Sequence, residues 1–125
     1  MFRSIVVAVD GSEPASRALE AACQLAGAFD GEIHLIHVTE NRNDPQGTSV
    51  MAAAAAQVQT AGITPSSTTV GEGDAFEEIM TIVGLYGADL VVTGRRGLGN
   101  ISGLFAGSTS QQIAKHAKCA FLSVR

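Results

Sequence analysis

Residues 89–110 read DLVVTGRRGLGNISGLFAGSTS, and this stretch decides how the chain can fold. An apolar, β-branched run comes first, a segment with five glycines follows, and hydroxyl residues then open a helical pattern. Glycine lets the main chain approach a ligand closely. The start of a helix offers unpaired N–H groups and a positive dipole end, which favour phosphate. The stretch therefore predicts a strand, a loop and a helix start that together bind an anion, most simply a nucleotide phosphate.

The same strand–helix alternation extends over the rest of the chain. Five short runs are rich in β-branched residues, and most lack the alternation of a half-exposed strand. Helical patterns lie between them. Repeated units of this kind imply a parallel sheet with right-handed crossovers and helices on both faces. We expect an open α/β fold with strands at residues 4–9, 32–39, 67–70, 89–93 and 120–124.

Several helix boundaries carry their own signals. Ser12 can cap the first helix, which has a proline in its first turn. Asp74 and Glu77 have the three-residue spacing of a capping box. Residues 41–47, NRNDPQG, form the clearest loop, and the second helical stripe is expected to begin after Thr48.

Composition limits the class of protein. The chain has 125 residues, of which 46% are hydrophobic and 16% charged, so we expect one folded domain over residues 1–125. The net charge of −4, with no Lys/Arg block, argues against a nucleic-acid partner. The first apolar run, residues 5–9, is too short for a signal peptide or a membrane span. Cys23 and Cys119 form no CxxC pair, which favours reduced, packed thiols in the cytoplasm.

A ligand site is expected at one edge of the sheet. Open parallel sheets bind ligands at the carboxyl ends of strands, where the strand order reverses. If the order is 3-2-1-4-5, that point lies between the first and fourth strands, beside Asp10 and Gly94. The Asp10 carboxylate suits ribose hydroxyls or a base amino group, and the main chain of Val38 could pair with a base edge. Arg95 and Arg96 could provide a local anion site.

The phosphate part of the site rests on the loop and the following helix start. Gly94 and Gly97 would let the chain bend around a phosphate or a ribose. Gly107 and Ser108 would present N–H groups, and the hydroxyls of Ser108 and Ser110 could donate as well. The loop has neither the GxxxxGK(S/T) pattern of a P-loop nor a GxGxxG fingerprint. Each of these interpretations has an alternative. The loop could be a flexible connector, and Asp10 could serve only a turn or the entry to a helix. At least one of Arg95 and Arg96 could lie at a solvated loop tip.

At this point the sequence resembles a known family. The spacing Gly94-x2-Gly97-x9-Gly107-Ser108 is similar to the nucleotide-binding pattern of the universal stress protein family. The opening IVVAVDGS (5–12), HVTE (37–40), and GEGDAFEEI (71–79) followed by GADLVVTGRRG (87–97) match in the same order. The resemblance covers essentially the whole chain. Arg96 stands where many members carry histidine or another residue.

The resemblance implies a Rossmann-like fold of the adenine nucleotide alpha hydrolase type, with five parallel strands in the order 3-2-1-4-5. It implies ATP, ADP or AMP as the ligand, with Mg²⁺ as a candidate bridge between phosphates. It also implies a homodimer through antiparallel pairing of residues 120–124. In the cofactor-binding set, Ala8 and Val9 line the base pocket, Asp10 contacts adenosine, Val38 contacts adenine, Gly94 lies near the ribose, and Arg96, Gly97, Gly107, Ser108, Thr109 and Ser110 belong to the phosphate side.

No catalytic set is visible in the sequence. It contains no HExxH motif, GxSxG elbow or paired-carboxylate pattern. His34, His37 and His116 are interpreted as packed or edge histidines. We therefore expect a regulatory, nucleotide-binding module of the stress response, cytoplasmic, with an unidentified protein partner and no membrane partner. A slow ATP hydrolase using Asp10, the only acidic candidate nearby, and a nucleotide-free dimerisation module remain the alternatives.

Overall fold

The computed structural model describes residues 1–95 and 108–125 of the chain. Within them, five strands form a sheet in the order β3-β2-β1-β4-β5, and every neighbouring pair is parallel. The predicted open α/β sheet and its strand order are therefore confirmed. The strands are β1 (Ser4–Ala8), β2 (Glu32–Thr39), β3 (Ser67–Glu72), β4 (Leu90–Gly94) and β5 (Ala120–Val124).

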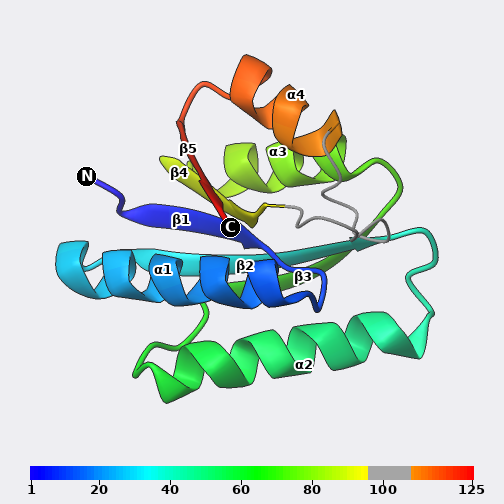
Figure 1. The fold of residues 1–125 in the computed structure, drawn as a ribbon, viewed down its shortest axis with the longest axis horizontal. Helices are drawn as coiled ribbons and strands as arrows, with labels where there is room; N and C mark the ends of the chain where they lie inside the picture. Colours follow the sequence, from blue (N-terminus) through cyan, green and yellow to red (C-terminus); the bar gives the residue numbers. More distant parts are fainter. Residues whose placement is uncertain (96–107) are drawn as a thin grey trace.

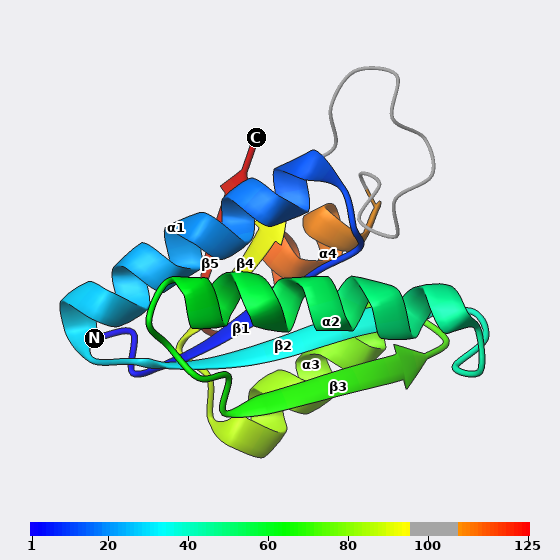
Figure 2. The same cartoon turned by 90° about the horizontal axis from the view of Figure 1, so that it is seen from below.

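Helices cover both faces of the sheet, as expected. In Figure 1, α1 (Glu13–Phe29) and α2 (Pro45–Thr60) lie on one face, and α3 (Ala75–Tyr86) and α4 (Ser108–His116) lie on the other. Figure 2 looks onto the side of α1 and α2. Successive side chains of β1 alternate between two cores: Val7 packs towards α1 and α2, and Val6 packs towards α3 and α4. Both faces of the central strands are buried, which explains their continuously apolar sequences.

Two of the predicted helix starts are confirmed by their caps. The Ser12 hydroxyl accepts a hydrogen bond from the Ala15 N–H at 3.2 Å and begins α1. The Asp74 carboxylate accepts from the Glu77 N–H at 2.9 Å and begins α3. Each contact satisfies one of the N–H groups that a helix leaves unpaired in its first turn.

The start of α2 differs from the prediction. The helix begins at Pro45 rather than after Thr48, because the Asp44 carboxylate caps it by accepting from the Gln46 N–H at 3.0 Å. In the sequence, aspartate followed by proline indicates a loop. The same pair is also typical of a helix start, since proline lacks an N–H and its fixed φ suits the first helical position.

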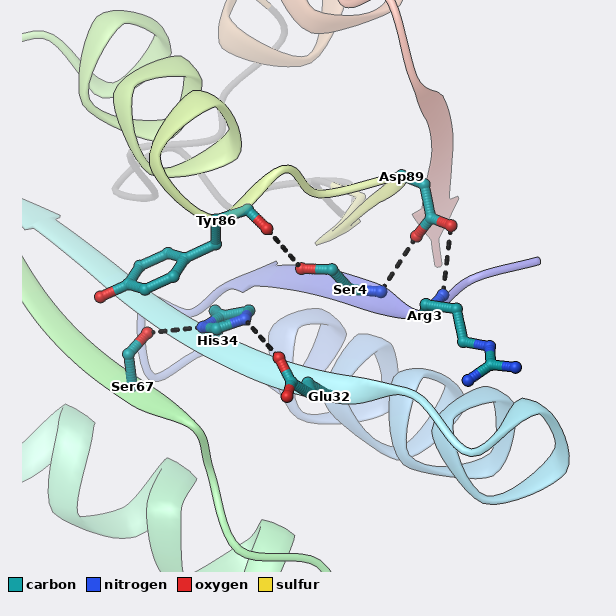
Figure 3. A network of polar contacts seen from close by, with 7 residues as sticks. All are labelled: Arg3, Ser4, Glu32, His34, Ser67, Tyr86 and Asp89. Atoms are coloured by element: carbon teal, nitrogen blue, oxygen red, sulfur yellow. Dashed lines mark hydrogen bonds and ion pairs between the residues drawn. The ribbon is translucent and has the colours of Figure 1, made fainter.

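The amino ends of the strands are held together by a polar network, drawn in Figure 3. The Asp89 carboxylate, just before β4, accepts hydrogen bonds from the main-chain N–H groups of Arg3 and Ser4, each at 3.1 Å. The Ser4 hydroxyl donates to the carbonyl of Tyr86 at 3.2 Å. Burial would raise the pKa of Asp89, but the bonds donated by Ser4 and Arg3 outweigh it, so this pKa lies below its ordinary value.

His34 forms the second half of this network. His34 is 2% exposed, and its ring stacks on Tyr86 with centroids 4.1 Å apart. Nδ1 lies 2.8 Å from the Ser67 hydroxyl. The Glu32 carboxylate is 3.5 Å from Nε2, an ion-pair distance at which Nε2 gains no hydrogen bond. Burial lowers the pKa of His34, and the nearby Glu32 carboxylate offsets part of this effect.

Two expectations from composition can be compared with the structure. No helix within residues 1–95 and 108–125 combines the length and the apolar character that a membrane crossing requires. Cys23 is buried and Cys119 half-buried, and both are free thiols. Burial raises the pKa of each thiol, which makes the reactive thiolate scarcer and agrees with packed, unreactive cysteines.

Candidate functional site

The carboxyl edge of the sheet brings together most of the predicted site that the structure describes. β1 lies between β2 and β4, and Ala8 of β1 is in register with Thr93 of β4. After β1 the chain passes to α1 on one face, whereas β4 leads towards α4 on the other face (Figure 1). The strand order therefore reverses between β1 and β4, which is where open α/β sheets bind ligands.

Asp10 shapes the turn that leaves β1. Its Oδ1 accepts a hydrogen bond from the Ser12 N–H at 2.9 Å, and the intervening Gly11 has a φ of 83°. An aspartate that bonds its own main chain two residues on is a common way of building such a turn. The helix-entry role left open by the sequence is therefore seen here, on a half-buried carboxylate at the expected edge.

β1 and β2 separate before the end of β2. Their register ends at Ala8 and Ile36, and the last main-chain hydrogen bond between the two segments in the described part of the chain runs from the Val9 N–H to the Ile36 carbonyl, at 2.9 Å. In parallel strands, alternate residues direct their main-chain groups towards the same neighbour. Val38 therefore directs its N–H and C=O towards β1, as Ile36 does, at a level where β1 has already ended.

His37 occupies the place where that separation begins. Its Nδ1 lies 2.8 Å from the Val9 carbonyl oxygen, and the residue is 7% exposed. Because a carbonyl oxygen only accepts, Nδ1 carries the proton and donates. The packed histidine expected from the sequence is confirmed. Its contact with the end of β1 is not foreseeable from the sequence, because the two residues lie 28 positions apart in the chain.

Gly94 has a packing role that the sequence did not indicate. A Cβ atom at this position would overlap the main chain of Pro14 and Ala15, and it would lie 2.7 Å from the Pro14 carbonyl oxygen. The first turn of α1 therefore packs directly against the end of β4. Whatever Gly94 contributes to a ligand site, the fold already requires glycine there.

The start of α4 also lies at the carboxyl edge. Because β4 and β5 are parallel, the helix between them runs back along the sheet and presents its first N–H groups at this edge. Thr109 is buried and Ser110 half-buried, and Ile113, one turn after Thr109, is buried in the core beneath α3 and α4. Of Ser108, only the position at the helix start is described. Arg96, Gly97 and Gly107 lie outside the described residues.

One buried polar group at this edge was not anticipated. The side chain of Thr93 is 0% exposed, and its hydroxyl has no hydrogen-bond partner among residues 1–95 and 108–125. Side chains alternate along a strand, so Thr93 faces the same side of β4 as Val91, towards α3 and α4. A buried hydroxyl without a partner is uncommon in folded proteins and calls for an explanation.

A cavity of about 210 Å³ opens beside the turn, between α1 and α2. Its walls are mostly apolar, and a reciprocal pair of hydrogen bonds between Ser16 and Gln57 crosses from one helix to the other. Among the residues around the cavity are Val9, Gly11, Leu19, Val50, Ala54 and Gln57. For metal binding, the described ranges 1–95 and 108–125 contain no cluster of three or more His, Cys, Asp or Glu side chains.

Comparisons with known proteins agree with this architecture. The family model described as the universal stress protein family matches residues 1–125. A universal stress protein of Thermus aquaticus is 31% identical over 137 residues, covering 100% of both chains. The structure of an Arabidopsis thaliana family member with AMP bound matches with a TM-score of 0.72 at 22% identity, over 97% of this chain and 90% of that one. The Archaeoglobus fulgidus protein in complex with dAMP matches with a TM-score of 0.78 at 19% identity, over 100% of both chains.

Proposed function

This chain belongs to the universal stress protein family, and from that premise we propose that it binds an adenine nucleotide at the carboxyl edge of its sheet. The observation that carries the proposal is the arrangement on the two sides of the switch point. The main chain of Val38 extends past the last paired residue of β1, and the first turn of α4 lies at the same edge. The Val38 side of this edge suits a planar base, and the α4 side suits an anion.

The proposed ligand lies across the ends of β2, β1 and β4. The base rests against Ala8 and Val9 and pairs with the main chain of Val38, while Asp10 contacts the adenosine. The ribose lies near Gly94. The phosphates lie over the start of α4, where the contacts are Arg96, Gly97, Gly107, Ser108, Thr109 and Ser110.

The nature of the nucleotide is supported by the family. The Arabidopsis thaliana protein carries AMP and the Archaeoglobus fulgidus protein carries dAMP, so both complexes contain adenine. For this chain we propose ATP, with ADP or AMP as the alternative ligands of the same site. Any Mg²⁺ would be held mainly by the phosphates, because residues 1–95 and 108–125 offer no cluster of protein ligands for it.

We further propose a dimeric, cytoplasmic regulatory module of one domain that uses neither nucleic acid nor membrane as a partner. β5 lies at an edge of the sheet and is only partly buried, so its outer side could pair with its twofold mate. The Arg95 N–H donates to the Val124 carbonyl at the end of β5. This contact links the proposed dimer strand to the chain that follows β4, where nucleotide occupancy could change a surface read by a protein partner.

Hydrolysis is the weaker alternative. The proposed site places the Asp10 carboxylate beside the adenosine, away from the phosphates where a water would have to be activated, and its Oδ1 atom already accepts the Ser12 N–H. The other alternative is a dimerisation module that binds no nucleotide. The binding experiment described next distinguishes it from the proposal.

Equilibrium dialysis of desalted protein against labelled ATP tests the proposal, with GTP as competitor. We expect saturable ATP binding that AMP displaces and GTP displaces poorly. Asp10→Ala should weaken binding, whereas Asp44→Ala should not, although Asp44 makes the same kind of contact with the N–H two residues on, at 3.0 Å against 2.9 Å. No binding up to millimolar ATP, together with no nucleotide released on acid precipitation, contradicts the proposal.

A further inference from the structure

The ladder of main-chain hydrogen bonds between β1 and β2 is interrupted at its carboxyl end. The Val9 N–H donates to the Ile36 carbonyl at 2.9 Å, in the pattern of a regular parallel pair. In that pattern the Val9 carbonyl would next accept the N–H of Val38. The described part of the chain contains no such bond.

The histidine ring takes the place of that bond. His37 Nδ1 lies 2.8 Å from the Val9 carbonyl oxygen and satisfies it as an acceptor. The ladder therefore lacks its next bond, from the Val38 N–H to the Val9 carbonyl, yet the Val9 carbonyl is not left unpaired. The N–H of Val38, which would otherwise have been its donor, is released.

The surroundings of His37 fix the ring in this position. The side chain is 7% exposed. A Cβ atom at Gly47, in the first turn of α2, would lie 3.4 Å from the ring's Cδ2 atom and 3.7 Å from a methyl group of Val70. Both distances correspond to ordinary van der Waals contact, so the first turn of α2 and Val70 lie close over the ring and leave it little room to turn away from Val9.

We propose that His37 is a positioning residue that leaves the main-chain N–H of Val38 unpaired with the end of β1, and so available to the base of the ligand. This inference rests on the proposed nucleotide site and adds a cause for its choice of base. Val38 offers an N–H donor beside a C=O acceptor. Adenine offers the complementary pair, a ring nitrogen that accepts and an exocyclic amine that donates, whereas guanine presents a donor and an acceptor in the opposite order at that edge. The histidine therefore favours adenine without touching it.

The test compares variants that differ in the ring's donor. His37→Leu removes the donor, so the Val38 N–H should turn to the vacant Val9 carbonyl. His37→Asn retains a donor at nearly the position of Nδ1 and serves as the matched control. His37→Phe is a second variant without a donor, and it replaces His37→Leu if that variant does not fold.

Two readouts separate this role from simple packing. Hydrogen exchange followed by NMR should show the Val38 amide exchanging at least about tenfold more slowly in the donor-free variant, because a hydrogen bond now protects it. In dialysis, ATP affinity should fall roughly tenfold, as expected for a lost hydrogen bond that is not compensated, and His37→Asn should stay close to the parent protein in both readouts.

The outcomes are distinct. If the parent protein binds ATP and the donor-free variants keep both its affinity and its Val38 exchange rate, His37 has no positioning role and this inference is overturned. If the parent protein binds no adenine nucleotide at all, the proposed function fails first and the base-positioning role fails with it.

Discussion

The two edges of the sheet carry polar groups in contrasting situations. At the amino edge, Asp89 and Ser67 are bonded to other groups of the protein, with two main-chain N–H groups on the carboxylate and His34 on the hydroxyl. At the carboxyl edge, the buried Thr93 hydroxyl has no partner within the described residues, and Val38 extends beyond its neighbour strand. The first arrangement stabilises the fold, since paired groups compensate each other's desolvation.

The difference indicates where binding can occur. A polar group that is already satisfied gains little from a ligand, whereas an unpaired one costs free energy until something binds it. The carboxyl edge retains such a group in Thr93, beside the unpaired main chain of Val38. At the amino edge the buried His34 Nε2 also lacks a hydrogen bond, but the Glu32 carboxylate lies 3.5 Å from it and can offset its desolvation. The amino edge, equally rich in polar side chains, is interpreted as structural.

The largest effect on stability is expected at Gly94. It tests whether the carboxyl edge also serves the fold, because an edge that served ligands alone would tolerate a side chain there. Gly94→Val places a side chain against the main chain of Pro14 and Ala15, so we expect the free energy of unfolding to fall by about 3 kcal/mol or more. Urea unfolding measures it. Gly84→Ala in α3 is the matched control: an added Cβ meets nothing within 4 Å, and the variant should gain roughly 0.5–1 kcal/mol. Equal stability of the two variants would contradict the packing role.

The next effect tests the amino edge. Asp89→Ala removes the acceptor for the N–H groups of Arg3 and Ser4 and should cost about 1–2 kcal/mol in urea unfolding at pH 7. The pKa of Asp89 is lowered in the folded state, so its contribution is present above the ordinary value of 3.8 and is lost as the pH falls through the lower folded pKa. As the pH falls from about 4 towards 2, parent and variant should therefore converge in stability. A constant difference down to pH 2 would be the contrary result.

A matched pair of hydroxyls compares the two edges directly. Ser67→Ala should destabilise the protein by about 1 kcal/mol, because His34 Nδ1 loses its partner at 2.8 Å. Thr93→Val keeps the shape of the side chain and removes a hydroxyl without a described partner, so stability should be unchanged or rise by up to about 1 kcal/mol. Thermal unfolding of both variants checks the pair. A loss in Thr93→Val equal to that in Ser67→Ala would show that the edges do not differ in this respect.

The smallest expected effect is the pH dependence contributed by His34. Its folded pKa lies below the ordinary value of 6.5, so the unfolded chain binds the proton more readily. His34 therefore adds no pH dependence well above pH 6.5, and it lowers stability as the pH falls from 6.5 towards the folded pKa. Between pH 7.5 and 5.5 the parent protein should lose more stability than the variant His34→Asn. Parallel curves for the two proteins would exclude this contribution.

Much of the fold could be predicted from local patterns. The uninterrupted apolar runs at β1 and β4 indicated strands buried on both faces, and Ser12 and Asp74 indicated two helix starts. The start of α2 is not predicted correctly because Asp44 and Pro45 suit a loop as well as a helix start, and it takes the structure to show that the Asp44 carboxylate caps the helix.

The site could be predicted less completely, because its decisive features depend on contacts between distant segments. Asp10 and Val38 fall at the expected edge, but nothing near His37 in the sequence indicates that its ring reaches Val9. Thr93 reads as one more β-branched strand residue, and its unpaired hydroxyl emerges only from its neighbours in space. Gly94 was interpreted through ligand binding alone, since the approach of α1 is invisible in the sequence.

The central claim is that the carboxyl edge binds the nucleotide and the amino edge does not. An amide NMR titration of the chain with ATP tests it most directly, because each residue reports its own environment. We predict that saturable shifts concentrate at the carboxyl edge, on Val9, Asp10, Val38, Gly94 and Thr109, and that the amino edge stays unchanged, on Arg3, Ser4, His34 and Asp89. Shifts centred on the amino edge, or none at millimolar ATP, would contradict the account.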